Sequence, residues 1–79
     1  MEAYILMKTE ANALWNIAEF TLRIEGVKTA QAVTGEFDVV ALASFPKIED
    51  LGRIIEKIQR LKGVRETETL IAIPPPVRE

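Results

Sequence analysis

The chain contains the segment Ile24-Glu25-Gly26-Val27-Lys28 and, 37 residues later, the similar segment Leu61-Lys62-Gly63-Val64-Arg65. Each segment joins an amphipathic stretch to a β-strand pattern through glycine, the residue that most often follows the end of a helix. At the same offset, Tyr4-Ile5-Leu6 corresponds to Ala41-Leu42-Ala43. The duplication predicts two strand–helix–strand units, which together give an α+β fold with the ferredoxin-like β-α-β-β-α-β order.

The hydrophobic pattern assigns the elements within each unit. We expect strands at residues 3–8, 27–34, 37–45 and 64–73, and helices from Asn12, as the N-cap, to Arg23 and between Pro46 and Gly63. The third strand is almost continuously apolar from Val39 to Ala43, which is typical of a central strand covered on both faces. Prolines 74–76 lack a backbone N–H, so residues 73–79 are expected to form an extended tail of a single domain spanning 1–79.

The first predicted helix carries two apolar stripes. The stripe expected to face the sheet consists of Ala11, Leu14, Trp15, Ala18, Thr21 and Leu22. Ile17, Phe20 and Ile24 form the second stripe, at spacings of three and four. A helix that contacts only one sheet and water needs no second stripe. These three residues are therefore predicted to contact another subunit, together with Ile71 and Ile73 of the last strand. An alternative for Ile17 or Ile24, but not for Phe20, is that the side chain wraps around the edge of the core.

The small size and apolar composition favour self-association. The chain has 79 residues, of which 48% are hydrophobic, and a domain of this size buries only about 60% of the surface of its unfolded chain. The absence of cysteine excludes disulfides, and without cysteine or histidine only oxygen ligands remain for a metal ion. Two helices cover one face of a four-stranded sheet, so we expect the other face to pack on a second copy, giving a two-fold dimeric α/β barrel.

The composition also disfavours several classes of function. Catalysis is not expected, because the chain lacks the histidine and cysteine that most often act as general base or thiol nucleophile. The net charge of −2, without clusters of Lys and Arg, argues against direct nucleic-acid binding. The start has neither the basic lead nor the cleavage site of a signal peptide, and no apolar run approaches the roughly 20 residues of a transmembrane helix. We expect a cytoplasmic protein without a metal ion or cofactor.

The turn between the second and third predicted strands is the best candidate for ligand binding. Gly35 supplies the turn, and Asp38 places a carboxylate at the head of an apolar strand. That carboxylate can hydrogen-bond free turn amides, or it can meet the ammonium group of a ligand whose carboxylate end is held by exposed backbone N–H groups. Thr67 and Thr69 offer two hydroxyl groups on one face of the last strand. The residues alone leave both roles of Asp38 open.

The order and spacing of these segments resemble the Lrp/AsnC effector domain, also called the RAM domain. Val33-Thr34-Gly35-Glu36-Phe37-Asp38 looks like its glycine-x-x-aspartate hairpin. Gly63-Val64, followed by Thr67 and Thr69, looks like the entry into its last strand, and Gly26-Val27 resembles its first helix-to-strand joint. The resemblance covers about residues 2–73.

The resemblance implies a domain that dimerises sheet to sheet, with dimers assembled into rings and amino-acid effectors bound between dimers. The residues implied in effector binding are Gly35, Glu36, Phe37, Asp38, Thr67 and Thr69. Regulators of this family also carry an N-terminal helix-turn-helix domain, for which the present chain has no room. The chain is therefore either a stand-alone effector domain, which we favour, or a piece of a larger protein. A stand-alone domain would trap its amino acid or co-assemble with a full-length Lrp/AsnC regulator.

Two other functions remain open at this stage. A small dimeric α+β barrel enzyme, such as a monooxygenase, shares the topology but generally needs polar or histidine groups inside the barrel, and the chain has no histidine. A ligand-free assembly module is the second alternative. Conversion of a substrate would favour the enzyme, and failure to bind any amino acid would favour the assembly module.

Overall fold

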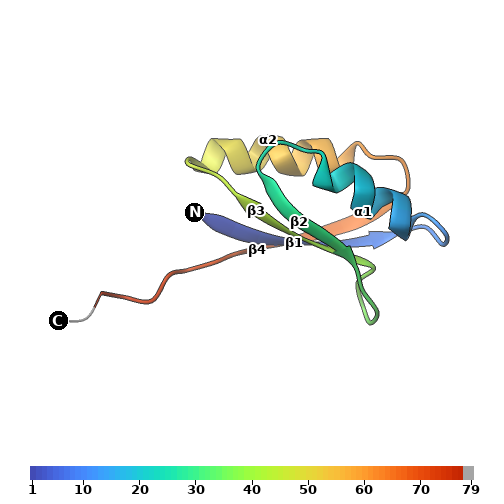
Figure 1. The fold of residues 1–79 in the computed structure, drawn as a ribbon, viewed down its shortest axis with the longest axis horizontal. Coiled ribbons are helices and arrows are strands. Elements are labelled where there is room, and N and C mark those ends of the chain that lie inside the picture. The colour runs from blue at the N-terminus through green and yellow to red at the C-terminus, as the bar shows by residue number, and fades with distance from the viewer. Residues whose placement is uncertain (78–79) are drawn as a thin grey trace.

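The computed structural model describes residues 1–77, which form a four-stranded sheet with both helices on one face (Figure 1). The elements are β1 (Glu2–Thr9), α1 (Leu14–Leu22), β2 (Val27–Ala32), β3 (Val39–Ser44), α2 (Ile48–Gln59) and β4 (Val64–Ile71). The strand order is β2-β3-β1-β4, and all pairings are antiparallel. The predicted α+β fold of β-α-β-β-α-β order is confirmed.

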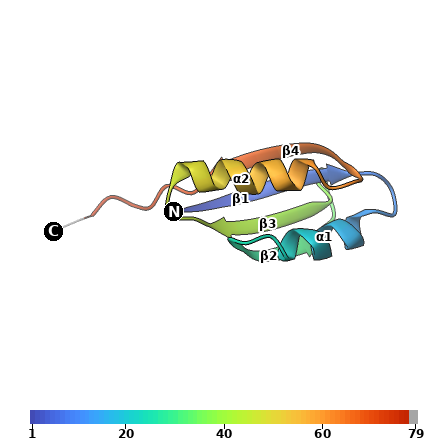
Figure 2. The same ribbon diagram turned by 90° about the horizontal axis from the view of Figure 1, so that it is seen from above.

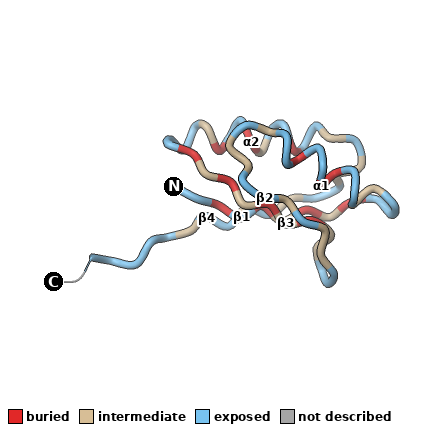
Figure 3. The backbone as a smooth tube through the Cα atoms, in the orientation of Figure 1, coloured by how far each residue is buried: buried red, intermediate tan, exposed pale blue. Residues whose placement is uncertain are grey.

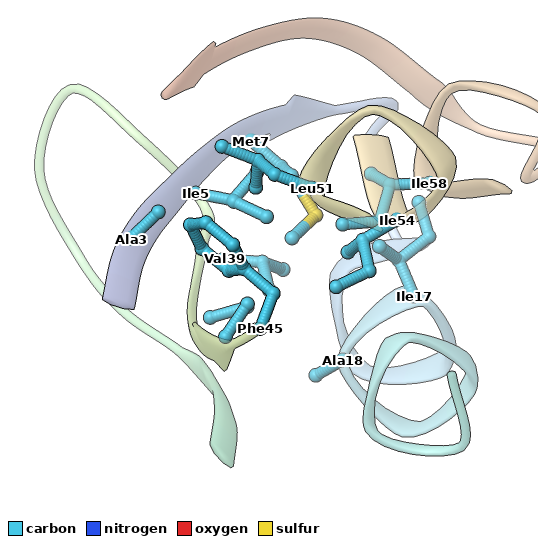
Figure 4. Packing of buried hydrophobic residues seen from close by; sticks show 12 residues of the cluster. Ala3, Ile5, Met7, Ile17, Ala18, Val39, Phe45, Leu51, Ile54 and Ile58 are labelled. Carbon is cyan, nitrogen blue, oxygen red and sulfur yellow. The ribbon is translucent and has the colours of Figure 1, made fainter. Parts of the chain in front are cut away.

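The hydrophobic core lies between the sheet and the helices. Seen from above, α1 covers the β2–β3 side of the sheet and α2 covers the β1–β4 side (Figure 2). Strands β1 and β3 bury every second residue toward the helices, so buried and less buried positions alternate along them (Figure 3). The buried hydrophobic residues are Ala3, Ile5, Met7, Ile17, Ala18, Val39, Ala41, Ala43, Phe45, Leu51, Ile54 and Ile58 (Figure 4).

The opposite face of the sheet is not covered by the chain itself. Tyr4 on β1 and its cross-strand partner Leu70 on β4 are 45% and 47% exposed. Leu6, Val40 and Leu42 also lie on this face, on the central strands, and are half-buried. We call these five residues the open face. A single chain therefore leaves the expected apolar surface uncovered, and its burial against a second copy stays a prediction.

The two glycines of the internal duplication both end a helix-to-strand turn with positive φ. Gly26 has φ of 97° and Gly63 has φ of 103°, a region that side chains other than glycine rarely adopt. A Cβ atom at Gly26 would also lie 2.8 Å from Ile54 Cδ1, and one at Gly63 would lie 3.1 Å from Ile17 Cδ1. Each glycine therefore meets two requirements: it permits the turn, and it lets a helix pack closely against the turn.

The ends of several elements differ from the sequence prediction. Helix α1 begins at Leu14 with Ala13 as its N-cap, and Asn12 is not the cap but a turn residue with φ of 70°. Asparagine tolerates this left-handed conformation better than most residues. Strand β2 ends at Ala32 and β3 begins at Val39, so the connection is longer than the two-residue turn that we predicted. Strand β4 ends at Ile71, two residues earlier than predicted.

Helix α1 also faces the sheet differently from the prediction. Ile17, predicted to contact another subunit, is 1% exposed and belongs to the core of its own chain, whereas Trp15, predicted to face the sheet, is 71% exposed. Leu22 of the same predicted stripe is 48% exposed. The reason lies at Gly63, whose missing side chain leaves room for the tip of Ile17. Ile24 is half-buried against the core, and Phe20 remains 45% exposed.

Candidate functional site

The candidate site begins with the loop of residues 33–38, which connects β2 to β3. The backbone N–H of Val33 donates to the carbonyl oxygen of Asp38 at 2.9 Å and so closes the base of the loop. Gly35 has φ of 116°, and no atom lies within 4 Å of the position that its Cβ would take. The loop tip therefore presents accessible backbone around a residue that permits close approach.

Asp38 ties this loop to the end of β1. Its backbone N–H donates to the carbonyl oxygen of Met7 at 2.8 Å. Its carboxylate atom Oδ2 accepts hydrogen bonds from the backbone N–H of Thr9 at 2.8 Å and from the Thr9 hydroxyl at 3.4 Å. The hydrogen bonds found to this carboxylate among residues 1–77 go to Oδ2, which leaves Oδ1 as an acceptor on a half-buried side chain. The groups that donate hydrogen bonds to the Asp38 carboxylate thus belong to the neighbouring strand β1 and not to the turn.

Phe37 attaches the loop to β1 at a second point. The ammonium group of Lys8 lies 5.6 Å from the centroid of the Phe37 ring, within the range of a cation–π interaction. Met7 and Thr9 point toward the helices and are buried, so Lys8, between them, projects from the open side of the sheet. Phe37 therefore lies on that side too, while Glu36 is exposed.

Thr67 and Thr69 lie on the helix side of the sheet. Their cross-strand partners are Met7 and Ile5, both buried beneath the helices, and directly paired residues project from the same face. The Thr67 hydroxyl accepts a hydrogen bond from Gln59 Nε2 at 3.2 Å. A hollow of about 410 Å³ opens beside Thr67 and is lined by Gln59, Val64, Arg65, Glu66 and Thr67.

The six predicted site residues therefore gather at one end of the sheet but not in one pocket. Met7 pairs with Val39 on one side and with Thr67 on the other, so β3 and β4 stand about 10 Å apart at this level. Phe37 is on the open side, whereas Thr67 is on the helix side. One chain alone does not enclose a ligand between the loop and the two threonines.

The sequence prediction missed Lys8 and Thr9, which hold the loop. Both lie at the end of the first strand, where the sequence gives no separate sign of a role. Their contact with Asp38 and Phe37 depends on the antiparallel pairing of β1 with β3, which brings Met7 opposite Val39. Pairing the first strands of the two halves, β1 and β3, in this register would have placed Lys8 and Thr9 beside the loop.

A second hollow lies at the opposite end of the molecule. This hollow of about 350 Å³ lies beside the start of α2 and is lined by Glu25, Gly26, Ser44, Phe45, Pro46, Asp50, Arg53, Ile54 and Lys57. Arg53 is engaged by Asp50 at 2.6 Å. The hollow contains none of the residues that we predicted for effector binding.

Comparison with known proteins identifies the family. The sequence model described as the Lrp/AsnC ligand binding domain matches residues 2–79. The chain belongs to the Lrp/AsnC ligand-binding domain family. The resemblance noted from the loop and the last strand is thereby confirmed. Domains of this family are related to transcription regulators, as the most similar curated proteins also indicate.

Two curated relatives place the domain in different settings. An uncharacterized HTH-type transcriptional regulator of Pyrococcus furiosus is 29% identical over 73 residues, which are 92% of this chain and 49% of that protein. A homocitrate synthase of Saccharolobus islandicus is 31% identical over 74 residues, which are 92% of this chain but only 16% of the enzyme. The chain thus spans about half the length of the curated regulator that it matches.

A solved structure has nearly the same length and fold. The crystal structure of a Thermus thermophilus protein superposes with a TM-score of 0.89 at 31% sequence identity, covering 98% of each chain. This agreement over almost the whole length supports the strand order and helix placement described above. Neither helix within residues 1–77 has the length and apolar character needed to cross a bilayer.

Proposed function

We propose that this protein is a non-catalytic sensor that binds a free amino acid at the 33–38 loop and works as an assembly of identical chains. The observation that carries the proposal is the arrangement at Asp38: Oδ2 is held by Thr9 and Oδ1 remains as an acceptor, while the tip of the same loop presents accessible backbone around Gly35. A carboxylate oxygen and accessible peptide groups on one short loop suit the two charged ends of an amino acid. The family, a ligand-binding domain, supports this assignment.

Assembly is part of the proposal because one chain leaves both the site and the sheet incomplete. The open face exposes Tyr4 and Leu70, and apolar surface of this kind commonly marks a contact with another subunit. Thr67 and Thr69 cannot join the loop of their own chain, since they project from the other side of the sheet. They can contribute to a ligand site only where a second copy brings its loop beside them. The exposed Phe20, Ile71 and Ile73 are further candidates for such contacts.

The relatives suggest how binding would be used. Since the P. furiosus regulator is about twice as long as the matched region, a domain like this one can report effector binding to a DNA-binding partner through a shared interface. Co-assembly with a full-length Lrp/AsnC regulator in the cytoplasm is the role that we favour. The partial match to homocitrate synthase supports a second candidate, in which the domain senses an amino acid on behalf of a biosynthetic enzyme.

A thermal-shift screen against the twenty amino acids tests the proposal. Ligand at a hundredfold its Kd adds about 2.7 kcal/mol to the stability of the folded state, so the effector should raise the Tm by several degrees. The substitution Asp38→Asn should remove this shift while keeping an oxygen for the Thr9 amide. Asp50→Asn, a matched change at the far end of the molecule, should retain it.

The outcomes of the screen separate the proposed functions. If no amino acid shifts the Tm of the wild-type chain, the ligand proposal fails and the ligand-free assembly module becomes the better interpretation. If an amino acid binds and Asp38→Asn binds it equally well, the site is not at the loop. Turnover of a substrate would instead favour the dimeric barrel enzyme.

A further inference from the structure

The chain continues beyond the sheet as a straight arm. Within residues 1–77, the last backbone hydrogen bond to the sheet runs from the Ala72 N–H to the carbonyl oxygen of Glu2 at 2.9 Å. Residues 73–77, which we call the arm, are all exposed, with Ile73 at 88% and Val77 at 92%. Figures 1 and 3 show the arm running outward from the end of β4, away from the rest of the molecule.

The arm is stiff for a covalent reason. Pro74, Pro75 and Pro76 fix φ and favour the polyproline II conformation, with a rise of about 3.1 Å per residue. The five residues therefore span about 15 Å and hold two large aliphatic side chains at a fixed separation. A segment that is already ordered loses little conformational entropy when it binds, so this arm is suited to docking.

The root of the arm adjoins the open face. Leu70, two residues before Ala72, lies on the edge strand β4 and pairs with Tyr4, and both residues are exposed on that face. From this point the arm leaves on the side of the sheet opposite the helices (Figure 1). Any chain that covers the open face would therefore be next to the arm.

From these observations we propose that the arm is a clasp between two copies of this chain. A second copy packs on the open face, and Ile73 and Val77 pack against the flank of that copy. Two-fold symmetry makes the contact reciprocal, so that each chain holds the other with its own arm. The occupant is a second copy rather than another protein because the arm begins three residues after Leu70 of the open face and leaves on that side of the sheet, so a copy that covers the open face lies within its reach. This inference rests on the proposed dimer and adds a segment outside the sheet to its interface.

Dilution of the full chain and of two variants, followed by sedimentation velocity, tests the clasp. One variant ends at Ala72, and the other carries Ile73→Ser and Val77→Ser with the prolines retained. Both changes lie outside the core, so both variants should fold. We expect the dimer Kd of each variant to rise at least about tenfold, since a buried aliphatic side chain contributes strongly to association. An unchanged Kd in both variants would overturn the clasp but leave the sheet-to-sheet dimer intact.

A label on the arm gives an independent measurement. The chain has no cysteine, so Pro75→Cys, which keeps both Ile73 and Val77, provides one attachment point for a spin label. The label should be immobilised at concentrations where the chain is dimeric and mobile after dilution. A label that is mobile at every concentration contradicts the clasp. The clasp is also contradicted if truncation at Ala72 changes the fluorescence of Trp15 but not the dimer Kd, because the arm would then contact the helix layer of its own chain. A full chain that is monomeric throughout would instead remove the proposed dimer itself.

Discussion

Single glycines determine where this chain can turn. Three of its four glycines have positive φ. The glycines also differ in how much space surrounds the position that a Cβ atom would take. Gly26 has both an unusual φ and a close neighbour, and Gly35 has an unusual φ in open space. Gly52 lies in α2 with ordinary φ and nothing within 4 Å. These positions therefore separate the energetic cost of strain from the cost of crowding.

Replacing Gly26, Gly35 and Gly52 with alanine should give a graded series. Gly26→Ala should destabilise the fold by about 2 kcal/mol, because strain adds to displacement of Ile54. Gly35→Ala should cost about 1 kcal/mol from strain alone. Gly52→Ala should stabilise by about 0.5–1 kcal/mol, since alanine favours the helix. Urea denaturation of the three variants measures the order, and a Gly35→Ala cost equal to that of Gly26→Ala would show that crowding contributes nothing.

At the scale of elements, the sequence predicted the strands better than the first helix. The duplication around Gly26 and Gly63 located both helix-to-strand turns, because glycine has a distinct conformational role there. Apolar side chains occur almost all around α1, so periodicity could not identify the side that meets the sheet. Ile17 was assigned to the wrong side because the space for it is created by Gly63, which is far away in sequence.

The loop shows the same limit for the candidate site. Val33 and Phe37 are residue types that favour strands, so the sequence pattern predicted a connection of only two residues between the second and third strands. The sequence correctly placed a glycine turn followed by an aspartate, but it could not supply the partner of that aspartate. The contact between Asp38 and Thr9 joins residues 29 positions apart, and it becomes visible only when the register of β1 and β3 is known.

Paired substitutions in α1 check which side of this helix supports the fold. Ile17→Ala should reduce the free energy of unfolding by about 3 kcal/mol, because it leaves a cavity beneath the helix. Trp15→Ala should change it by less than about 0.5 kcal/mol, since that side chain lies mostly in solvent. Chemical denaturation at one protein concentration gives both values. A larger loss for Trp15→Ala would restore the orientation predicted from the sequence.

At the scale of the whole molecule, the helices cover only one face of the sheet. Both helices lie on the same face of the sheet (Figure 2), and the buried cluster lies entirely between these layers. A chain of 79 residues can enclose one core but not two. Association through the open face is the simplest way to shield the remaining apolar side chains.

A charge in the middle of the open face should therefore prevent dimerisation. Leu42→Glu places a carboxylate at the centre of the proposed contact, where burial without a partner is costly. Analytical ultracentrifugation should show a folded monomer, as judged by unchanged far-UV circular dichroism. Ile48→Glu, on the 51% exposed first residue of α2, is the control and should remain dimeric. A Leu42→Glu variant that still dimerises would exclude the open face as the interface.

The hydrogen bonds at the end of β1 join the loop that precedes β3 to the turn that precedes β4 in one short path. Thr9 donates to Asp38, and the next residue, Glu10, donates its backbone N–H to the carbonyl oxygen of Gly63 at 2.8 Å. A molecule that pulls on the aspartate will therefore disturb the turn that precedes β4. If the loop binds a ligand as proposed, its occupancy can be transmitted from the start of β3 to the start of β4 through two consecutive peptide units, without a hinge or a second domain.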